Sequence, residues 1–338
     1  MADVLKLAFV GCGAIAQHHL AGIREECKNV RVTAAIDPEI EKAERMAADT
    51  GAEAFTSLEA ALQGGDFDAV DIMVPHDLHE PLAIEALRAG KHVLLEKPMA
   101  PTLEACDRIL TVAAEVGTVF MVAENAQYWP EVLLAQEILD SGEIGEVTTA
   151  RAAFVAQVDN QWYSGERPWR YDEKRRGGGV VIDGGSHWIR PLRMWLGEIE
   201  SVVAVSGRPW KTVEAETLLR ALCRFESGIY ASFDALELAG AMAPEQWFKV
   251  SGTEGELVMD GVFDGGLTVY SPASPEGRLV AEPRGWAKSF GPEIADFESA
   301  VLHGKPLEAG PEETLAELRT ALAMYRSAKS GQWEKVWD

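Results

Sequence analysis

Short apolar runs alternate with amphipathic stretches along the first third of the chain, a pattern typical of strands and helices in turn. The run Ala69–Val74 is almost continuously apolar, as expected for a strand of a parallel sheet with both faces covered. Asp37 and Asp77 each stand where a side chain can cap a helix, with Pro38 as a first helical residue. The pattern predicts strands at 5–10, 30–36, 53–55, 69–74, 92–96 and 119–123, and helices at 37–49, 57–63, 77–89, 102–116 and 130–141. A doubly wound parallel sheet of the α/β class follows, in a domain over residues 1–124.

A different pattern begins near Gly145, where alternating apolar and polar positions are separated by turns rich in Gly, Pro, Asn and Asp. Strands are predicted at 146–158, 199–208, 215–226, 228–236, 246–252 and 256–270. One helix at about 178–195 interrupts them, and helices at about 291–303 and 311–329 close the chain. We expect residues 125–338 to form an α+β domain with a large, mostly antiparallel open sheet, whose last helices can pack back on the first domain.

The formal charge of −23 over 338 residues disfavours nucleic acid and anionic membrane as partners. No apolar run reaches the ~20 residues that a membrane span needs. The chain starts directly in a strand without a basic signal segment, and its four cysteines are scattered. We therefore expect a reduced, cytoplasmic protein without disulfides. His76 and His79 are three residues apart but lack a third ligand, so no metal site is expected.

The first candidate binding segment is Gly11–Ala16, where a strand ends in the sequence GCGAIA and a helical pattern follows. Such a turn lays a pyrophosphate on the N-terminus of a helix. Gly11 permits the tight turn, Gly13 allows the backbone to approach the phosphates, and Ala16 allows close helix packing. Asp37 closes the next apolar run, where a carboxylate would bind the ribose hydroxyls and repel a 2′-phosphate. The sequence predicts a Rossmann domain that binds NAD, with NADP less favoured.

Two further segments have residues suited to hydride chemistry. Lys97 follows the apolar run His92–Glu96, at a strand end where ligands bind in open α/β sheets. Asp183 and His187 are four residues apart, so on a helix they share one face, and the glycines before them would let a ligand approach. A histidine can take a hydroxyl proton as hydride leaves the carbon, while a carboxylate holds the imidazole and an ammonium stabilises developing alkoxide. These residues favour an oxidoreductase that acts on CH–OH groups.

Together with Glu96-Lys97-Pro98 and the run GGGVVIDGGSHW at 177–188, these motifs resemble the Gfo/Idh/MocA family of oxidoreductases, over nearly the whole chain. The family is named for glucose–fructose oxidoreductase, inositol dehydrogenase and a rhizopine-catabolism protein. The resemblance implies that Lys97, Asp183 and His187 form the catalytic group, with Lys97 also reaching the nicotinamide ribose. It further implies cofactor contacts from the loop 75–79 and from Trp169-Arg170.

We therefore expect two overlapping sets of site residues. The expected cofactor contacts are Gly11, Gly13, Ala14, Ile15, Asp37, Pro75, His76, His79, Glu96, Lys97, Trp169 and Arg170. The expected substrate contacts are Lys97, Asn125, Gln127, Trp162, Arg170, Asp183 and His187. All ten tryptophans lie from Trp129 onward, either as an aromatic core and interface or as a sugar-stacking surface.

The sequence departs from the family's pattern at two positions. Gln127 stands where the family commonly has the arginine of Asn-x-Arg, which removes a charged donor for an anionic substrate group. Arg190 stands three residues after His187, where the family often has Asp. Pro191 cannot donate to the carbonyl of His187, so we expect the helix to kink or end there.

The predicted function is oxidation of a secondary hydroxyl of a sugar, cyclitol or related polyol, with His187 as the general base. Two alternatives on the same fold stay open. One is an NAD-dependent glycosidase or epimerase that oxidises its substrate only transiently, and the other is an NAD-sensing regulatory protein. An exposed face of the antiparallel sheet, together with the resemblance, predicts a homodimer or homotetramer.

Overall fold

The computed structural model describes residues 4–157, 168–240, 246–260, 266–282 and 285–337. The chain forms two compact units. The first contains residues 1–124 and 290–315, and the second contains residues 125–289 and 316–338. Helix α9 (Phe290–His303) therefore belongs with the N-terminal sheet although it lies near the end of the sequence.

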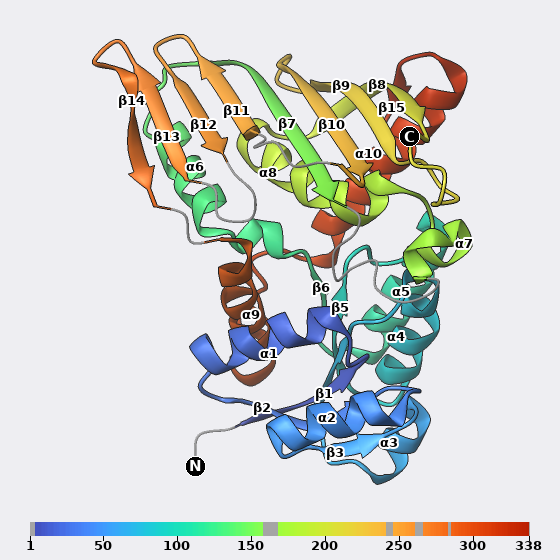
Figure 1. Cartoon of the computed structure of the whole chain (residues 1–338). Helices are drawn as coiled ribbons and strands as arrows, with labels where there is room; N and C mark the ends of the chain where they lie inside the picture. The colour runs from blue at the N-terminus through green and yellow to red at the C-terminus, as the bar shows by residue number, and fades with distance from the viewer. Residues whose placement is uncertain (1–3, 158–167, 241–245, 261–265, 283–284, 338) are drawn as a thin grey trace. The chain divides into compact units, whose positions relative to one another are not determined.

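The first unit is built on a six-stranded sheet in which all neighbouring strands are parallel (Figure 1). The spatial order β3-β2-β1-β4-β5-β6 has its switch point between β1 and β4, where such sheets bind ligands at the carboxyl ends of the strands. This confirms the predicted doubly wound fold. The strands are β1 (Leu5–Val10), β2 (Val30–Ile36), β3 (Glu53–Phe55), β4 (Ala69–Ile72), β5 (His92–Glu96) and β6 (Phe120–Ala123).

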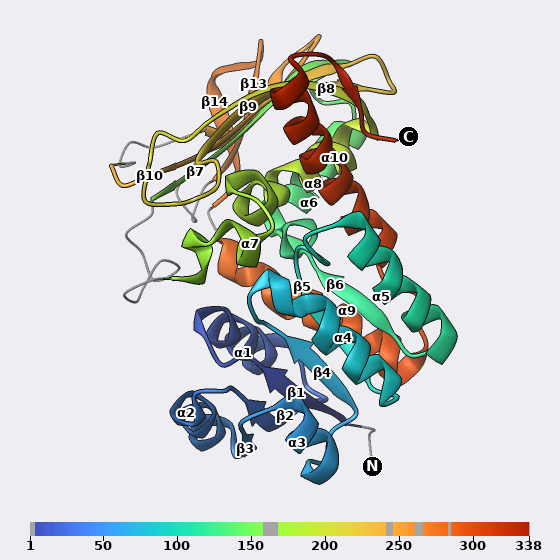
Figure 2. The same cartoon turned by 90° about the vertical axis from the view of Figure 1, so that its right-hand side faces the viewer.

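Helices pack against this sheet and against one another. Helix α1 lies beside α9 (Figure 1), so closely that a Cβ on Gly22 would lie 2.6 Å from the backbone nitrogen of Gly291. Helices α4 and α5 lie side by side (Figure 2). Besides α9, the helices of this unit are α1 (Ala14–Glu26), α2 (Ile40–Thr50), α3 (Leu58–Gly64), α4 (His79–Arg88) and α5 (Leu103–Val116).

Two of these helices begin later than predicted. Helix α2 starts at Ile40 with Glu39 as its N-cap, because Asp37 Oδ1 accepts the Glu39 N–H at 2.9 Å in a turn that precedes the helix. Helix α4 starts after the short 3-10 turn η1 (His76–Leu78), which contains Asp77. The predictions of Asp37 and Asp77 as N-caps were therefore wrong.

The second unit is built on a nine-stranded sheet of order β14-β13-β12-β11-β7-β10-β9-β8-β15. Among the described strands of this second sheet, only β7 and β10 pair in parallel, which confirms the mostly antiparallel sheet. The predicted strand 256–270 is two strands, and β14 was missed because its sequence is polar and contains Pro and Gly. The strands are β7 (Val147–Gln157), β8 (Ile199–Gly207), β9 (Leu218–Phe225), β10 (Tyr230–Leu238), β11 (Gln246–Gly252), β12 (Glu256–Asp260), β13 (Leu267–Ser271), β14 (Ser274–Ala281) and β15 (Glu334–Lys335).

Helices α8 and α10 lie on one face of this sheet (Figures 1 and 2), where the Ala204 N–H of β8 donates to Ser327 Oγ of α10 at 2.9 Å. Helix α10 (Pro311–Ser330) begins in the first unit and ends in the second. The other helical segments are η2 (Asn125–Tyr128), α6 (Pro130–Asp140), η4 (Trp169–Tyr171), α7 (Glu173–Arg176), η5 (Val181–Gly185), α8 (Ser186–Leu196) and η6 (Trp286–Ser289).

The single helix predicted at 178–195 is replaced by two consecutive segments. Residues 181–185 of η5 form a π-helical turn, and the α-helix α8 follows directly. Helix α8 continues past Pro191 to Leu196, so the helix does not end at the proline. The lost hydrogen bond to the carbonyl of His187 is outweighed because the helix fully buries Ile189 and Leu192.

All four cysteines are buried, and none of them forms a disulfide. Within the described ranges, no helix has both the length and the apolar character to cross a membrane. In the same residues, His, Cys, Asp and Glu side chains form no group of three or more that could hold a metal ion.

Candidate functional site

The glycine turn joins the carboxyl end of β1 to the N-terminus of α1. Gly11 has φ +95°, and a Cβ there would lie 2.3 Å from the Met73 carbonyl oxygen, so only glycine fits. Gly13 is the N-cap of α1, is exposed, and a Cβ there would meet nothing within 4 Å. Ala16 is fully buried, as expected for close packing of helix on strand. Gly11 is thus required by the fold, whereas the fold alone does not explain Gly13.

Asp37 lies directly beside this turn. Its Oδ2 accepts the Cys12 N–H at 3.0 Å, and its Oδ1 accepts the Glu39 N–H, so the carboxylate is held in one orientation. Burial raises the pKa of the Cys12 thiol to about 12, which keeps the turn free of a thiolate. An open helix N-terminus with a fixed carboxylate one strand away fits a dinucleotide, with its pyrophosphate at the turn and its ribose at Asp37.

Two expected cofactor residues are buried after β4, His76 in the turn η1 and His79 at the start of α4. The His79 ring is fully buried, with Nδ1 2.8 Å from the Pro98 carbonyl oxygen and Nε2 2.9 Å from the Val74 carbonyl oxygen. Burial lowers the pKa of His79, so its neutral ring donates to one of these two carbonyls. The His79 ring thus lies between the Val74 carbonyl after β4 and the Pro98 carbonyl after β5.

Strand β5 ends at Glu96 and leads into a turn with Lys97 and Pro98, whose peptide bond is cis. Glu96 is buried, and its Oε2 accepts the Lys97 N–H at 3.1 Å. Its Oε1 lies 3.0 Å from Nε2 of His19, a fully buried residue of α1. Sequence analysis missed His19 as a partner of this motif, and Asp71, which interrupts the apolar strand β4, was the available signal.

In the second unit, Asp183 is held by two arginines. Its Oδ2 accepts Arg170 Nε at 2.7 Å and Arg176 Nε at 3.0 Å. Arg176 is fully buried and also forms a bidentate ion pair with Glu237, which is buried in β10. The structure therefore brings together two predicted residues, Asp183 and Arg170, through a third, Arg176, that the sequence did not indicate. The guanidinium of Arg170 also lies 4.3 Å from the ring centroid of Trp169.

The glycines before Asp183 accommodate protein groups. A Cβ on Gly178 would lie 2.9 Å from the Tyr325 hydroxyl, and one on Gly179 would lie 2.1 Å from Glu216 Oε2. Tyr325 of α10 accepts the Gly179 N–H at 3.0 Å and donates to Glu216 Oε1 at 2.7 Å. The expectation that these glycines let a ligand approach was therefore wrong at both positions, which instead let η5 pack tightly.

Burial raises the pKa of Glu216 to about 7, against the effects of Tyr325, Arg176 and the Val181 N–H. Oε1 of Glu216 accepts that N–H at 3.3 Å. A carboxyl that titrates near neutrality thus supports the first turn of η5.

His187 is partly exposed at the start of α8. Beneath the helix, Trp188 packs against Phe154, Trp129 and Trp247, with ring centroids 4.6, 6.1 and 5.4 Å away. These three tryptophans are at most 5% exposed, so they form an aromatic core rather than a sugar-stacking surface. The expected substrate residue Trp162 lies outside the described residues.

The two positions that depart from the family's pattern contact each other. Arg190 Nη2 donates to Gln127 Oε1, and both side chains are buried. Arg190 Nη1 also lies 3.6 Å from Glu317 of α10, and nearby Asn125 donates to Ser289 Oγ at 2.8 Å. Gln127 of η2 is therefore hydrogen-bonded to a guanidinium that comes from α8.

Comparison with known proteins identifies the family of the chain. Residues 5–124 match an oxidoreductase family model with an NAD-binding Rossmann fold, and residues 132–258 match the GFO/IDH/MocA C-terminal domain. A 1,5-anhydro-D-fructose reductase from Ensifer adhaerens is 31% identical over 291 residues, which is 84% of each chain. The crystal structure of an oxidoreductase from Thermotoga maritima has a TM-score of 0.87 at 28% identity and 99% coverage of both chains. That of GenD2 from gentamicin A biosynthesis, in complex with NAD, has a TM-score of 0.84 at 26% identity, with 99% and 97% of the chains covered. The chain belongs to the GFO/IDH/MocA family of NAD-binding oxidoreductases.

Proposed function

We propose that the protein is an NAD-dependent dehydrogenase that oxidises a secondary hydroxyl of a sugar, cyclitol or related polyol. The observation that carries the proposal is that the glycine turn, Asp37 and Lys97 directly follow β1, β2 and β5 of one parallel sheet. The carboxyl ends of parallel strands lie at one edge, so a phosphate cradle, a ribose carboxylate and an ammonium group share it. The 1,5-anhydro-D-fructose reductase among the relatives supports a carbohydrate substrate.

In this proposal His187 acts as the general base. A ring nitrogen of His187 takes the hydroxyl proton while the carbinol carbon loses a hydride, and the product is a ketone. Bound NAD supplies the hydride acceptor, C4 of its nicotinamide. The Lys97 ammonium stabilises negative charge that develops on the substrate oxygen and also contacts the nicotinamide ribose. Asp183, itself held by Arg170 and Arg176, orients the His187 ring.

Selection of NAD over NADP would depend on Asp37. Its two oxygens already accept backbone N–H groups, which fixes the carboxylate toward the ribose side of the turn. A 2′-phosphate placed there would meet this negative charge, and no basic residue follows in the sequence Pro38-Glu39-Ile40-Glu41. We therefore propose NAD as the preferred cofactor.

A panel of free sugars, inositols, anhydrosugars and sugar acids with NAD, followed by NADH absorbance, tests the function. Lys97→Ala and His187→Ala should each lower turnover at least ~100-fold, because each removes a group that stabilises the transition state. Their thermal stability should stay close to that of the wild type, since both side chains are partly exposed. Near wild-type turnover in either variant contradicts the assignment. NAD-responsive binding to a protein partner without turnover on the panel would favour a regulatory protein instead.

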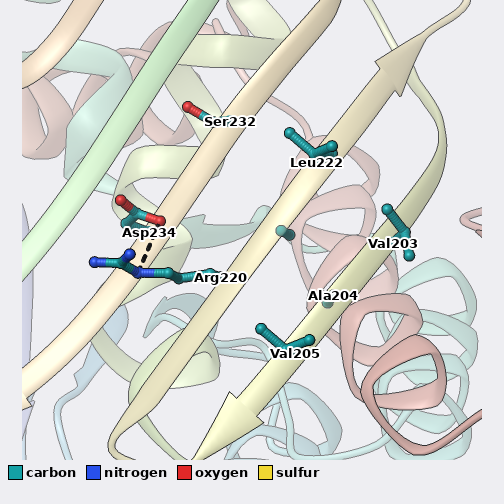
Figure 3. Close-up of a pocket in the computed structure, with 8 residues that line it drawn as sticks. Val203, Ala204, Val205, Arg220, Leu222, Ser232 and Asp234 are labelled. Atoms are coloured by element: carbon teal, nitrogen blue, oxygen red, sulfur yellow. Dashed lines mark ion pairs between the residues drawn. The ribbon is translucent and has the colours of Figure 1, made fainter. Parts of the chain in front are cut away.

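We also propose a homodimer or homotetramer in the cytoplasm, assembled through the open face of the nine-stranded sheet. Val203, Val205 and Leu222 lie on the face opposite the helices (Figure 3), with Val205 64% and Leu222 48% exposed. An ion pair of 3.5 Å between Arg220 and Asp234 borders this apolar group. Light scattering should show an assembly that Leu222→Arg weakens, and a monomeric wild type contradicts the proposal.

A further inference from the structure

The Glu96-Lys97-Pro98 turn is held from inside the first unit by His19 of helix α1. The His19 ring is fully buried, with Nδ1 2.8 Å from Asp71 Oδ2 and Nε2 3.0 Å from Glu96 Oε1. A neutral imidazole has one N–H donor, so hydrogen bonds to two carboxylates require the doubly protonated ring. Although burial opposes its charge, Asp71 and Glu96 raise the pKa of His19 well above the ordinary value. The geometry and this shift favour the imidazolium form of His19, although burial also raises the pKa of Asp71.

The groups around this cation leave Asp71 and Glu96 as its partners. Glu293 of α9 is fully buried, and neither of its carboxyl oxygens has a hydrogen-bond partner. Burial raises the pKa of Glu293 well above its usual range, which keeps it neutral. The Phe290 ring lies 5.1 Å from the His19 ring and covers it on the side of α9. Further titratable groups near the cluster are His18 of α1, Glu124 after β6, and His79, which interacts electrostatically with Glu96.

Glu96 connects this cation to the lysine of the site. One of its oxygens is bound by His19 Nε2, and the other accepts the backbone N–H of Lys97 at 3.1 Å. A carboxylate fixed at both oxygens cannot rotate without breaking one of these bonds. At the far end of the turn, the Pro98 carbonyl oxygen lies 2.8 Å from Nδ1 of His79. The backbone N–H of Lys97 is thus held by Glu96, which His19 binds in turn.

We propose that His19 is a positioning residue, whose imidazolium fixes the Glu96 carboxylate and, through it, the backbone of Lys97. The inference rests on the proposed role of Lys97 in the reaction. His19 itself lies out of reach of a ligand, since its ring is fully buried. It acts through Glu96, and its loss should lower turnover by displacing the ammonium group.

A matched pair of substitutions separates this role from simple filling of space. In His19→Asn the amide nitrogen takes the place of Nδ1, which keeps the donor to Asp71 and loses the donor to Glu96. In His19→Gln it takes the place of Nε2, which keeps the donor to Glu96. We expect His19→Asn to lower kcat at least ~10-fold and His19→Gln at most ~3-fold, although both lose similar thermal stability. His18→Asn, the same change one residue earlier, is the control.

Acetylation of Lys97 gives a readout that needs no substrate. We expect acetic anhydride to label Lys97 at least ~3-fold faster in His19→Asn than in the wild type, because the turn is released, with His19→Gln close to the wild type. Mass spectrometry measures the rate at this residue. Full turnover in Lys97→Ala would contradict the proposed function. The labelling rate of Lys97 in the two His19 variants would then be the only test of the positioning role. Equal losses of kcat in the two His19 variants, or wild-type labelling in His19→Asn, overturns it.

Discussion

The two glycines of the phosphate turn should respond differently to the same substitution. Gly13 has φ −82° and ψ −159°, which any residue adopts, and a Cβ there meets nothing within 4 Å. Gly13→Ala should therefore change the free energy of unfolding by at most ~1 kcal/mol, because the loss at the helix N-cap is offset by lower entropy of the unfolded chain. It should nevertheless weaken NADH at least ~10-fold, or ~1.4 kcal/mol, since the methyl group occupies the space the pyrophosphate needs.

Gly11→Ala is the matched control, because its obstacle lies within the protein. The left-handed backbone at φ +95° costs ~1–2 kcal/mol for alanine, and the Cβ at 2.3 Å from the Met73 carbonyl oxygen adds ~1–3 kcal/mol of overpacking. The expected loss of ~3 kcal/mol is measured by urea unfolding, and NADH affinity by fluorescence titration. A folded Gly13→Ala variant with wild-type NADH affinity refutes the placement of the pyrophosphate at this turn.

Three further predictions concern other parts of the protein. Asp37→Ala should raise the affinity for NADP relative to NAD, and an unchanged ratio of the two dissociation constants contradicts the ribose role. Burial raises the pKa of Glu216 to about 7 from 4.5, so the folded state retains this proton and loses stability as pH rises between these values. The expected loss in the free energy of unfolding is ~3 kcal/mol, at 1.36 kcal/mol per pKa unit. Urea unfolding compared at ~pH 5 and ~pH 8 measures it, and Glu216→Gln should abolish this loss. Gln127→Arg should destabilise the fold by ~3 kcal/mol, because it adds a second buried guanidinium beside Arg190. In the double variant with Arg190→Asp, the loss of unfolding free energy should be at least ~1 kcal/mol smaller than the sum of the two single losses. Additive losses would show that the two side chains do not interact.

Features that depend on neighbouring residues were predictable from the sequence. The alternation of strands and helices, the turn at Gly11 and the position of Asp37 follow from periodicity and from the steric needs of glycine. Helix starts were less predictable, because Asp37 uses its side chain in the preceding turn and at Cys12 rather than as a cap. Helix α8 passes through Pro191, because burial of its apolar face outweighs one lost hydrogen bond.

The buried charge clusters were not predictable, because their members lie far apart in the sequence. His19 meets partners 52 and 77 residues away, and Arg176 meets Glu237 61 residues away. One signal was available at Asp71, since a carboxylate inside an otherwise apolar strand requires a buried partner. The glycines at 178 and 179 pointed to ligand contact when only the sequence was considered, yet Tyr325 and Glu216 fill the space beside them.

The central claim is net oxidation of a polyol by bound NAD, and the stoichiometry of the wild-type reaction tests it most directly. The substrate found in the panel is incubated with excess NAD, and NADH formed is compared with substrate consumed. The account predicts one NADH for each substrate molecule converted to a ketone, with no NADH formed by His187→Ala on the same timescale. Conversion of substrate without accumulation of NADH would contradict the account, because the oxidation would then be transient.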